Sequence, residues 1–214
     1  MSASAKAPRK KRYVERPDIR TTLLNAAEAL IREEGYAAAT ARRIASKIGL
    51  KHQAVFYYFG TQDELLLALV QRSSQAHREQ LEAALRSDQP LRALWDMQRD
   101  RDATKFHLEL LALANHNATI RAELADAAVI VRALEAEAIE RHFKAKGIEP
   151  RLPAQLVSIL TNALARLLIQ ESTLGIEVGH DEVEALVEAS LRSFELGGDV
   201  ANPFALQAAA APQS

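Results

Sequence analysis

The chain has 214 residues, 48% of them hydrophobic and 26% charged, and a formal net charge of −1, which predict a globular protein with one large or two small domains. No apolar run approaches the ~20 residues of a membrane-spanning helix, and the basic, polar N-terminus lacks the apolar core of a secretory signal, so we expect a cytoplasmic protein. The absence of cysteine excludes disulfides, thiolate metal sites and thiol nucleophiles.

The first predicted elements are a basic arm and an amphipathic helix. Residues 1–16 are polar and include a basic run at residues 8–12 without apolar periodicity, so we expect a flexible arm. The arm either reaches phosphates or an adjacent minor groove, or serves only as a solubilising tail. A helix is expected to begin at Pro17 and to stop at Gly35, because apolar residues recur between them at helical spacing, namely Leu23, Leu24, Ala27, Leu30 and Ile31.

Residues 40–59 are the most informative segment, because their pattern predicts two short helices joined by a turn. Ala45 is small where the two helices would touch, Gly49 can adopt the positive φ that ends the first helix, and Val55 falls on the inward face of the second. This pattern is typical of a DNA-binding helix-turn-helix. The alternative is an ordinary helical hairpin inside a core.

The charge distribution supports the same interpretation. Residues 1–60 hold twelve lysines and arginines against five acidic residues, whereas residues 61–214 hold fifteen against twenty-three. A basic module neutralises phosphates and releases condensed counterions, and an acidic remainder is repelled by a duplex. We therefore expect the first 60 residues to face DNA and the remainder to face away.

The remainder of the chain is predicted to be helical nearly throughout. Thr61 can cap a long helix that runs to about Ser87, before Pro90. No strand-like alternation and no internal repeat occurs, and the tail from Gly197 has no amphipathic pattern, so the predicted fold class is all-α. Further helices are expected near residues 91–99, 103–115, 118–146, 153–174 and 181–196, which gives about nine helices in all.

The order of these elements resembles the tetracycline-repressor (TetR) family of transcriptional regulators, most closely over residues 20–69. Beyond residue 70 the resemblance is limited to length and helical content. It implies a helix-turn-helix DNA-binding domain at residues 17–60, a larger helical regulatory and dimerisation domain at 61–197, and a flexible tail at 198–214. The motifs that carry it are Ile44-Ala45, Gly49-Leu50, Phe56-Tyr57-Tyr58-Phe59 and Asp63-Glu64-Leu65-Leu66.

The resemblance implies which residues contact DNA. Thr40 would cap the second helix and contact a phosphate, and Arg42 is the best candidate for two hydrogen bonds to a guanine edge. The following residues would open the recognition helix in the major groove, and the tyrosine hydroxyls suit phosphates unless their rings only stabilise the domain. The candidate DNA-binding residues are Thr40, Arg42, Arg43, Lys51, His52, Gln53, Ala54, Tyr57 and Tyr58, whereas Val55 and Phe59 are expected to pack inward.

Four positions depart from the usual family pattern. Phe56 replaces a common tyrosine, and Lys51 stands where a serine or threonine cap is frequent. Gln62 stands where many members place a lysine directed at the DNA backbone, and Arg43 occupies a position that is often acidic. We therefore expect phosphate contacts to be redistributed, with Lys51, Arg43 and the arm as candidates.

Family regulators act as symmetric dimers whose recognition helices lie about 34–36 Å apart, one duplex turn. An effector that prefers a mis-spaced conformation would lower the affinity for DNA. The last two predicted helices have wide apolar faces, which form either the dimer surface or only the monomer's own core. The candidate dimer residues are Leu156, Ile159, Leu160, Ala163, Leu164, Leu167 and Leu168, with Val183, Leu186, Val187, Leu191 and Phe194.

An effector pocket is expected among the helices of the larger domain, for a small apolar or aromatic molecule that can carry a carboxylate. The apolar residues that would line this pocket are equally suited to an ordinary hydrophobic core. The histidines form no metal-binding spacing, and neither a metal nor a cofactor is expected. The candidate pocket residues are Trp95, Met97, Phe106, Leu110, Leu113 and Val131, with His107, Asn115 and His116 as polar groups.

Two other classes of protein are weighed against a ligand-responsive repressor. An all-α enzyme needs a clustered acid/base or metal set on facing helices, and the sequence contains none, so we expect no enzymatic activity. A constitutive DNA-binding protein would use the larger domain only for dimerisation. An enclosed cavity in that domain would favour a ligand-responsive regulator over this alternative.

Overall fold

The computed structural model describes residues 18–149 and 152–196, with side chains described to residue 194. The predicted arm, the predicted tail and the predicted start at Pro17 lie outside these residues. The all-α expectation is confirmed, because the described residues form only helices and connecting turns. These are α1 (Ile19–Glu34), the short 3-10 helix η1 (Tyr36–Ala38), α2 (Ala41–Lys47), α3 (Gln53–Phe59), α4 (Gln62–Leu85), α5 (Pro90–Gln98), α6 (Arg101–His116), α7 (Ala118–Lys146), α8 (Ala154–Thr173) and α9 (His180–Leu196).

Local capping residues set several of these helix ends. Asp18 caps α1 by accepting a hydrogen bond from the Arg20 amide at 3.2 Å. Thr61 caps α4 as predicted, and the Glu64 carboxylate accepts a hydrogen bond from the Thr61 amide, which completes a capping box. Asp100 caps α6 and starts it at Arg101, earlier than the predicted position near residue 103.

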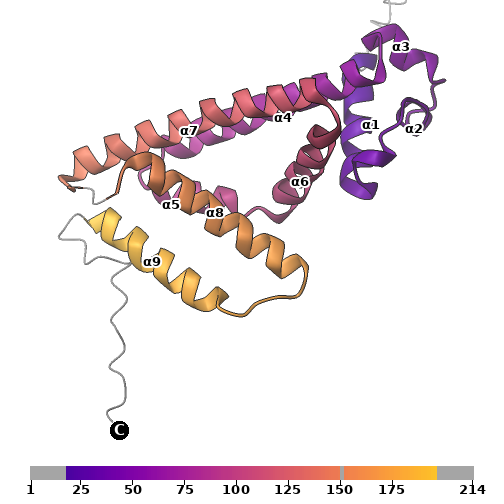
Figure 1. Cartoon of the computed structure of the whole chain (residues 1–214). Coiled ribbons are helices and arrows are strands. Elements are labelled where there is room, and N and C mark those ends of the chain that lie inside the picture. Colours follow the sequence, from indigo (N-terminus) through magenta and orange to yellow (C-terminus); the bar gives the residue numbers. More distant parts are fainter. Residues whose placement is uncertain (1–17, 150–151, 197–214) are drawn as a thin grey trace, which may run out of the picture.

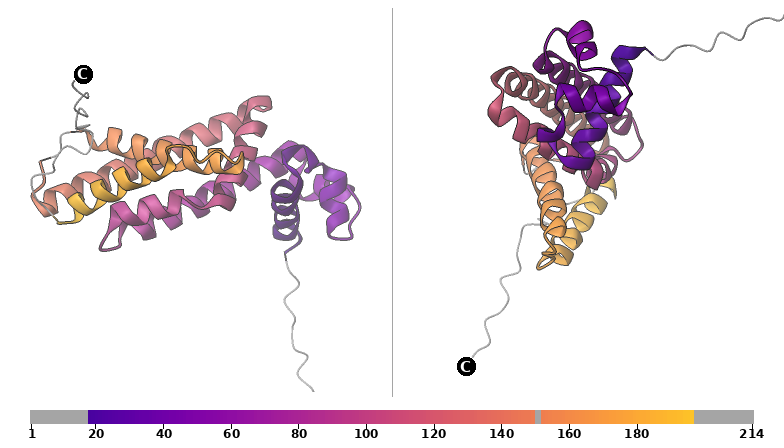
Figure 2. Two further views of the ribbon diagram at one scale, coloured as in Figure 1. Left: turned by 90° about the horizontal axis from the view of Figure 1, so that it is seen from below. Right: turned by 90° about the vertical axis from the view of Figure 1, so that its right-hand side faces the viewer.

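The helices form an elongated molecule with a small head at one end (Figure 1). The head contains α1, α2 and α3, and α4 runs from it into the body. Within the body, α7 lies along α4, α8 packs against α7, and α9 is the outermost layer below α8. Figure 2 shows the same arrangement from two further sides. None of the described helices is long and apolar enough to cross a membrane.

Two hydrophobic cores hold the molecule together, and the first crosses the predicted boundary between domains. It joins the head helices to α4, to the start of α7 and to α6, through Phe106, Leu110 and Leu113. The second core lies farther along the body, where Trp95 of α5 packs with Ile139 and Phe143 of α7 and with residues of α8 and α9. The head and α6 therefore share one core.

Candidate DNA-binding surface and effector site

The segment from α2 to α3 has the packing predicted for a helix-turn-helix. Ile44, Ala45 and Val55 are fully buried, so the two short helices touch through small and branched side chains. Gly49 has a φ of +72°, and the amide of Leu50 donates to the carbonyl of Ala45 at 2.9 Å. This left-handed residue ends α2 and turns the chain into α3.

Helix α3 presents a row of exposed aromatic and polar side chains to solvent. Tyr57 is 83% exposed and contacts Tyr58 edge to face, with ring centroids 4.9 Å apart. Phe59 packs inward as predicted, and the Arg20 guanidinium lies 4.7 Å from the centroid of its ring. Of the other candidate contacts at the start of this helix, Lys51, His52 and Gln53 are exposed and Ala54 is half-buried.

The two adjacent arginines of α2 have different environments. Arg42 is exposed, and no described residue lies within hydrogen-bond or ion-pair distance of its guanidinium. Arg43 instead pairs with Glu34 of α1, and Lys47 pairs with Glu33 at 2.7 Å. The structure therefore places Arg43 in the contact between α1 and α2, while Arg42 is open to a ligand.

The N-terminus of α2 is closed by two side chains. Thr40 caps it as expected, accepting a hydrogen bond from the Arg43 amide at 3.4 Å. Gln62, at the start of α4, accepts a hydrogen bond from the Ala41 amide at 2.8 Å. The role of Gln62 was missed in the sequence, because the pair is 21 residues apart and no local pattern links it.

Helix α6 is fastened to the head by a set of contacts that we call the α6 latch: Glu109 with Gly35 and Tyr36, and Arg32 with Phe106. Glu109 accepts a hydrogen bond from the Tyr36 amide at 2.8 Å. Its carboxylate lies so close to Gly35, whose φ is +86°, that a Cβ there would be 3.2 Å from Oε2. The Arg32 guanidinium lies 4.1 Å from the centroid of the Phe106 ring. No sequence motif predicted these contacts.

A cluster of polar side chains is buried in the body where α5, α7 and α8 meet. Glu135 of α7 is only 1% exposed. Its carboxylate accepts hydrogen bonds from Ser158 at 2.5 Å, from Asn162 at 2.8 Å and from Gln98 at 3.5 Å. Burial raises the pKa of Glu135, and the hydrogen bonds from Ser158 and Asn162 oppose that rise.

Two histidines and an arginine lie beside this cluster. Burial and, to a lesser extent, the charge of Arg166 on α8 together lower the pKa of His107 on α6 to about 4. The pKa of His77 on α4 is lowered for the same two reasons. Burial also lowers the pKa of Arg166, and the charge of Glu135 opposes this. Side chains from α4, α6, α7 and α8 thus converge on one polar region, in which both histidines are neutral near pH 7.

The predicted effector residues do not form one pocket. Trp95 belongs to the second core, whereas Phe106, Leu110 and Leu113 belong to the first. Asn115 and His116 are exposed at the end of α6, and the Tyr36 ring stacks on His116. Met97, Val131 and His107 are half-buried. Of these candidates, only His107 lies in the polar region. Trp95, Phe106, Leu110 and Leu113 pack in the two cores, which is the alternative that their helical spacing also allowed.

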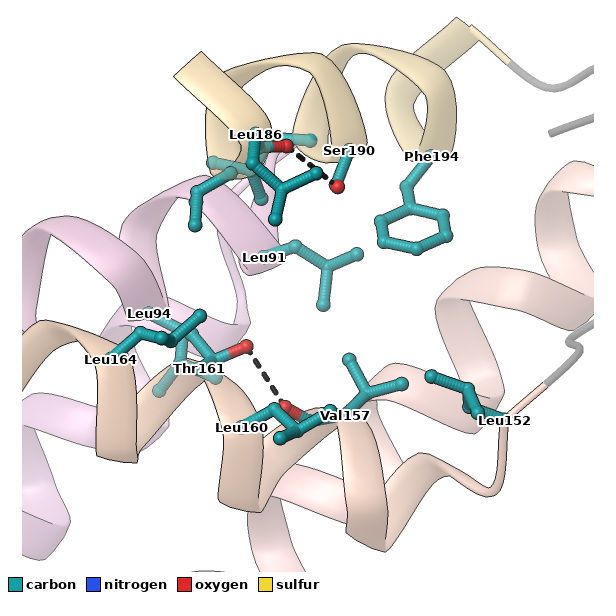
Figure 3. Close-up of a pocket in the computed structure, with 12 residues that line it drawn as sticks. Leu91, Leu94, Leu152, Val157, Leu160, Thr161, Leu164, Leu186, Ser190 and Phe194 are labelled. Carbon is teal, nitrogen blue, oxygen red and sulfur yellow. Dashed lines mark hydrogen bonds between the residues drawn. The ribbon is translucent and has the colours of Figure 1, made fainter. Parts of the chain in front are cut away.

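A separate apolar pocket lies between α5, α8 and α9 (Figure 3). The Thr161 and Ser190 hydroxyls donate to carbonyls of their own helices, so the lining is almost entirely hydrocarbon. Its volume of about 70 Å³ is well below that of cavities that hold benzene, so it fits a packing gap better than an effector site. It is lined by Leu91, Leu94, Leu152, Val157, Leu160, Thr161, Leu164, Leu186, Val187, Ser190, Leu191 and Phe194.

The predicted dimer residues divide between two faces. Leu156, Ile159 and Leu167 are 37%, 38% and 47% exposed and share one face of α8 with the exposed Ala163, which we call the outer α8 face. The others point into the monomer, because an apolar stripe has the same spacing whether it meets a neighbouring helix or a partner chain. These inward residues are Leu160, Leu164, Leu186, Val187, Leu191 and Phe194 at the apolar pocket and Leu168 and Val183 in the second core.

Comparisons with known proteins agree with this architecture. Residues 23–69 match the family described as bacterial regulatory proteins, tetR family. No curated protein matches the chain. A solved protein from Saccharomonospora viridis in complex with choline is 22% identical, with a TM-score of 0.69 over 81% of this chain and 95% of that one.

Two further solved structures share the fold. A TetR transcription regulator from Haloarcula marismortui is 20% identical, with a TM-score of 0.64 over 82% of this chain and 95% of its own. The transcriptional regulator FadR from Bacillus subtilis, in complex with stearoyl-CoA, is 16% identical, with a TM-score of 0.60 over 84% of this chain and 99% of its own.

Proposed function

Because its helix-turn-helix domain belongs to the TetR family of bacterial regulatory proteins, we propose that this chain is a transcriptional repressor released from its operator by a small molecule. The observation that carries the proposal is the exposed surface of α2 and α3. Arg42 and the side chains that begin α3 are open to a duplex, while Val55 and Phe59 hold the helix in place. The excess of basic residues in the first 60 residues adds attraction to phosphates.

A homodimer is the assembly that gives such a head enough contact with DNA. Two recognition helices one duplex turn apart would enter successive major grooves. We propose that the outer α8 face forms the contact between the two chains, since it leaves Leu156, Ile159 and Leu167 exposed in the monomer. A two-fold axis would bring this face against its own copy and bury it.

The α6 latch is the proposed connection between effector and DNA. Helix α6 carries His107 at the polar region of the body and, two residues later, Glu109 against the head. An effector that binds better to a conformation with α6 displaced would move the head and change the spacing of the recognition helices. Repression is the simpler outcome of DNA binding, because a protein that covers a promoter needs no contact with polymerase.

Genomic footprinting of the purified full chain, followed by a screen for molecules that release it from the recovered site, tests this function. We expect protected sites with two half-sites about one helical turn apart, and release by at least one small molecule. Binding with no preference for any duplex over competitor DNA would refute the proposal. Specific binding that no molecule releases would favour a constitutive DNA-binding protein.

A further inference from the structure

We propose that the effector is a small carboxylate whose anionic group binds Arg166 on α8, beside the carbonyl oxygen of Asn162. The inference rests on the proposed function, because it assigns the effector's chemistry to the body of a ligand-responsive regulator. It depends on two polar groups, the Arg166 guanidinium and Asn162 Oδ1, that the described structure leaves without hydrogen-bond partners.

Arg166 is a half-buried cation that forms no ion pair with any described residue. No described residue lies within hydrogen-bond or ion-pair distance of its guanidinium. The exposed arginine Arg99 pairs with Glu184, and the half-buried Arg72 pairs with Glu28 at 2.9 Å. Withdrawing a guanidinium from water without a partner is unfavourable, so a site of this kind favours an anion that reaches it.

The nearby carboxylate of Glu135 does not serve as that anion. Its charge acts on Arg166, but the two groups are not within ion-pair distance. Glu135 is already occupied by hydrogen bonds from Ser158, Asn162 and Gln98. The same occupancy argues against a cationic effector here, because such a molecule would find no open carboxylate in the cluster.

Asn162 lies one helical turn before Arg166 and supplies the second group. Its Nδ2 donates to Glu135 Oε2 at 2.8 Å and to the Ser158 carbonyl at 2.9 Å. Both partners are acceptors, so the amide cannot be turned around without losing two hydrogen bonds. Asn162 Oδ1 is then buried with no hydrogen-bond partner. A hydroxyl or N–H close to the effector's carboxylate would satisfy it.

The remaining charges around Arg166 select a monoanion. His77 on α4 and His107 on α6 have lowered pKa values and are neutral near pH 7, while Arg132 on α7 is exposed. One half-buried guanidinium matches one carboxylate through two parallel hydrogen bonds, whereas a phosphate dianion would need a second cation beside it. The polar region therefore fits a carboxylate.

Titration of the labelled full chain with acetate and with benzoate, followed by NMR of the arginine Nε–H and histidine signals, tests the inference. We expect saturable shifts of the Arg166 signal and a rise in the pKa of His107, because a bound anion offsets the charge of Arg166. Benzamide, which has the same shape without the charge, should cause neither change.

Matched variants separate the site from a general charge effect. Arg166→Gln should weaken benzoate binding about tenfold or more, because it removes charge-assisted hydrogen bonds. Arg166→Lys keeps the positive charge and should bind benzoate with intermediate affinity. It therefore shows whether a loss of binding in Arg166→Gln comes from the lost guanidinium or from a loss of folding. Arg132→Gln removes a neighbouring exposed charge and should leave the affinity unchanged.

Three results would overturn the inference: no saturation by either carboxylate, equal binding of benzamide, or equal binding by Arg166→Gln. Fluorescence anisotropy of the recovered duplex on the same samples distinguishes this failure from failure of the proposed function. Carboxylate binding without DNA binding would refute the repressor and keep the anion site. DNA binding without carboxylate binding would refute the anion site and leave the proposed repressor standing.

Discussion

At the scale of single residues, Arg42 and Arg43 show how neighbours in sequence come to have different roles. Both were candidate DNA contacts, because both are cations in a helix-turn-helix. Successive positions on a helix point about 100° apart, so only one of them can face α1. That one is Arg43, paired with Glu34, and Arg42 is left exposed.

Arg42→Ala is expected to weaken binding to the operator by about 1–3 kcal/mol and to relax the preference at one base position. The reason is the loss of a guanidinium that can make two hydrogen bonds to a guanine. Anisotropy titrations with the operator and with a scrambled duplex measure the effect. Arg101→Ala, which removes an exposed charge from the body, is the matched control. Equal losses on both duplexes would show that Arg42 contacts only the backbone.

His107 predicts how stability depends on pH. Its pKa is about 4 in the folded chain against 6.5 for the free side chain. Between these values the unfolded chain binds a proton that the folded chain does not, so stability falls as the pH drops from 6.5 to 4. His107→Gln should reduce that fall by up to roughly 3 kcal/mol, measured by urea unfolding at several pH values. Identical pH profiles for both proteins would contradict the buried, neutral histidine.

At the scale of helices, α6 contributes to both parts of the molecule. Phe106, Leu110 and Leu113 belong to the core that they share with the head, and Glu109 accepts a hydrogen bond from the first amide of η1. His107, on the same helix, reaches the polar region of the body. The resemblance to known regulators placed the boundary at residue 61, before α4, but the packing makes α6 a second connection between the two parts.

Glu109→Ala is expected to lower the free energy of unfolding by about 1–3 kcal/mol, because it leaves the Tyr36 amide without its acceptor. It should also reduce the change in DNA affinity that an effector causes. Urea unfolding and release assays measure the two effects. Glu123→Ala is the control, since Glu123 bonds only the Gln71 side chain across α4 and α7. An effector response unchanged in Glu109→Ala would exclude the latch from the coupling.

At the scale of the whole molecule, the proposed contact between two copies of the chain depends on α8. The inner side of this helix packs on the body and lines the apolar pocket, and its outer face leaves Leu156, Ile159 and Leu167 partly exposed. A monomer with this face in water exposes apolar side chains along one continuous stripe, which is typical of an interface.

Leu167→Glu should convert the proposed dimer to a monomer, because a charge on the outer α8 face would be buried against its own copy. Light scattering coupled to size-exclusion chromatography measures the mass. Leu50→Glu adds the same charge in the turn between α2 and α3, where Leu50 is 37% exposed, and should leave the dimer intact. A dimeric Leu167→Glu protein would place the interface elsewhere.

The sequence by itself determined the helices and the helix-turn-helix, because caps, glycine stops and apolar spacing act within a few residues of one another. Thr61 and Glu64 illustrate this, since three positions separate the two halves of the capping box. The tertiary structure alone decided the pairing of Glu109 with Tyr36, the Glu135 cluster beside Arg166, and which side of α8 faces outward. These features join residues far apart in the chain and depend on how each helix is rotated against its neighbours, which no local pattern specifies.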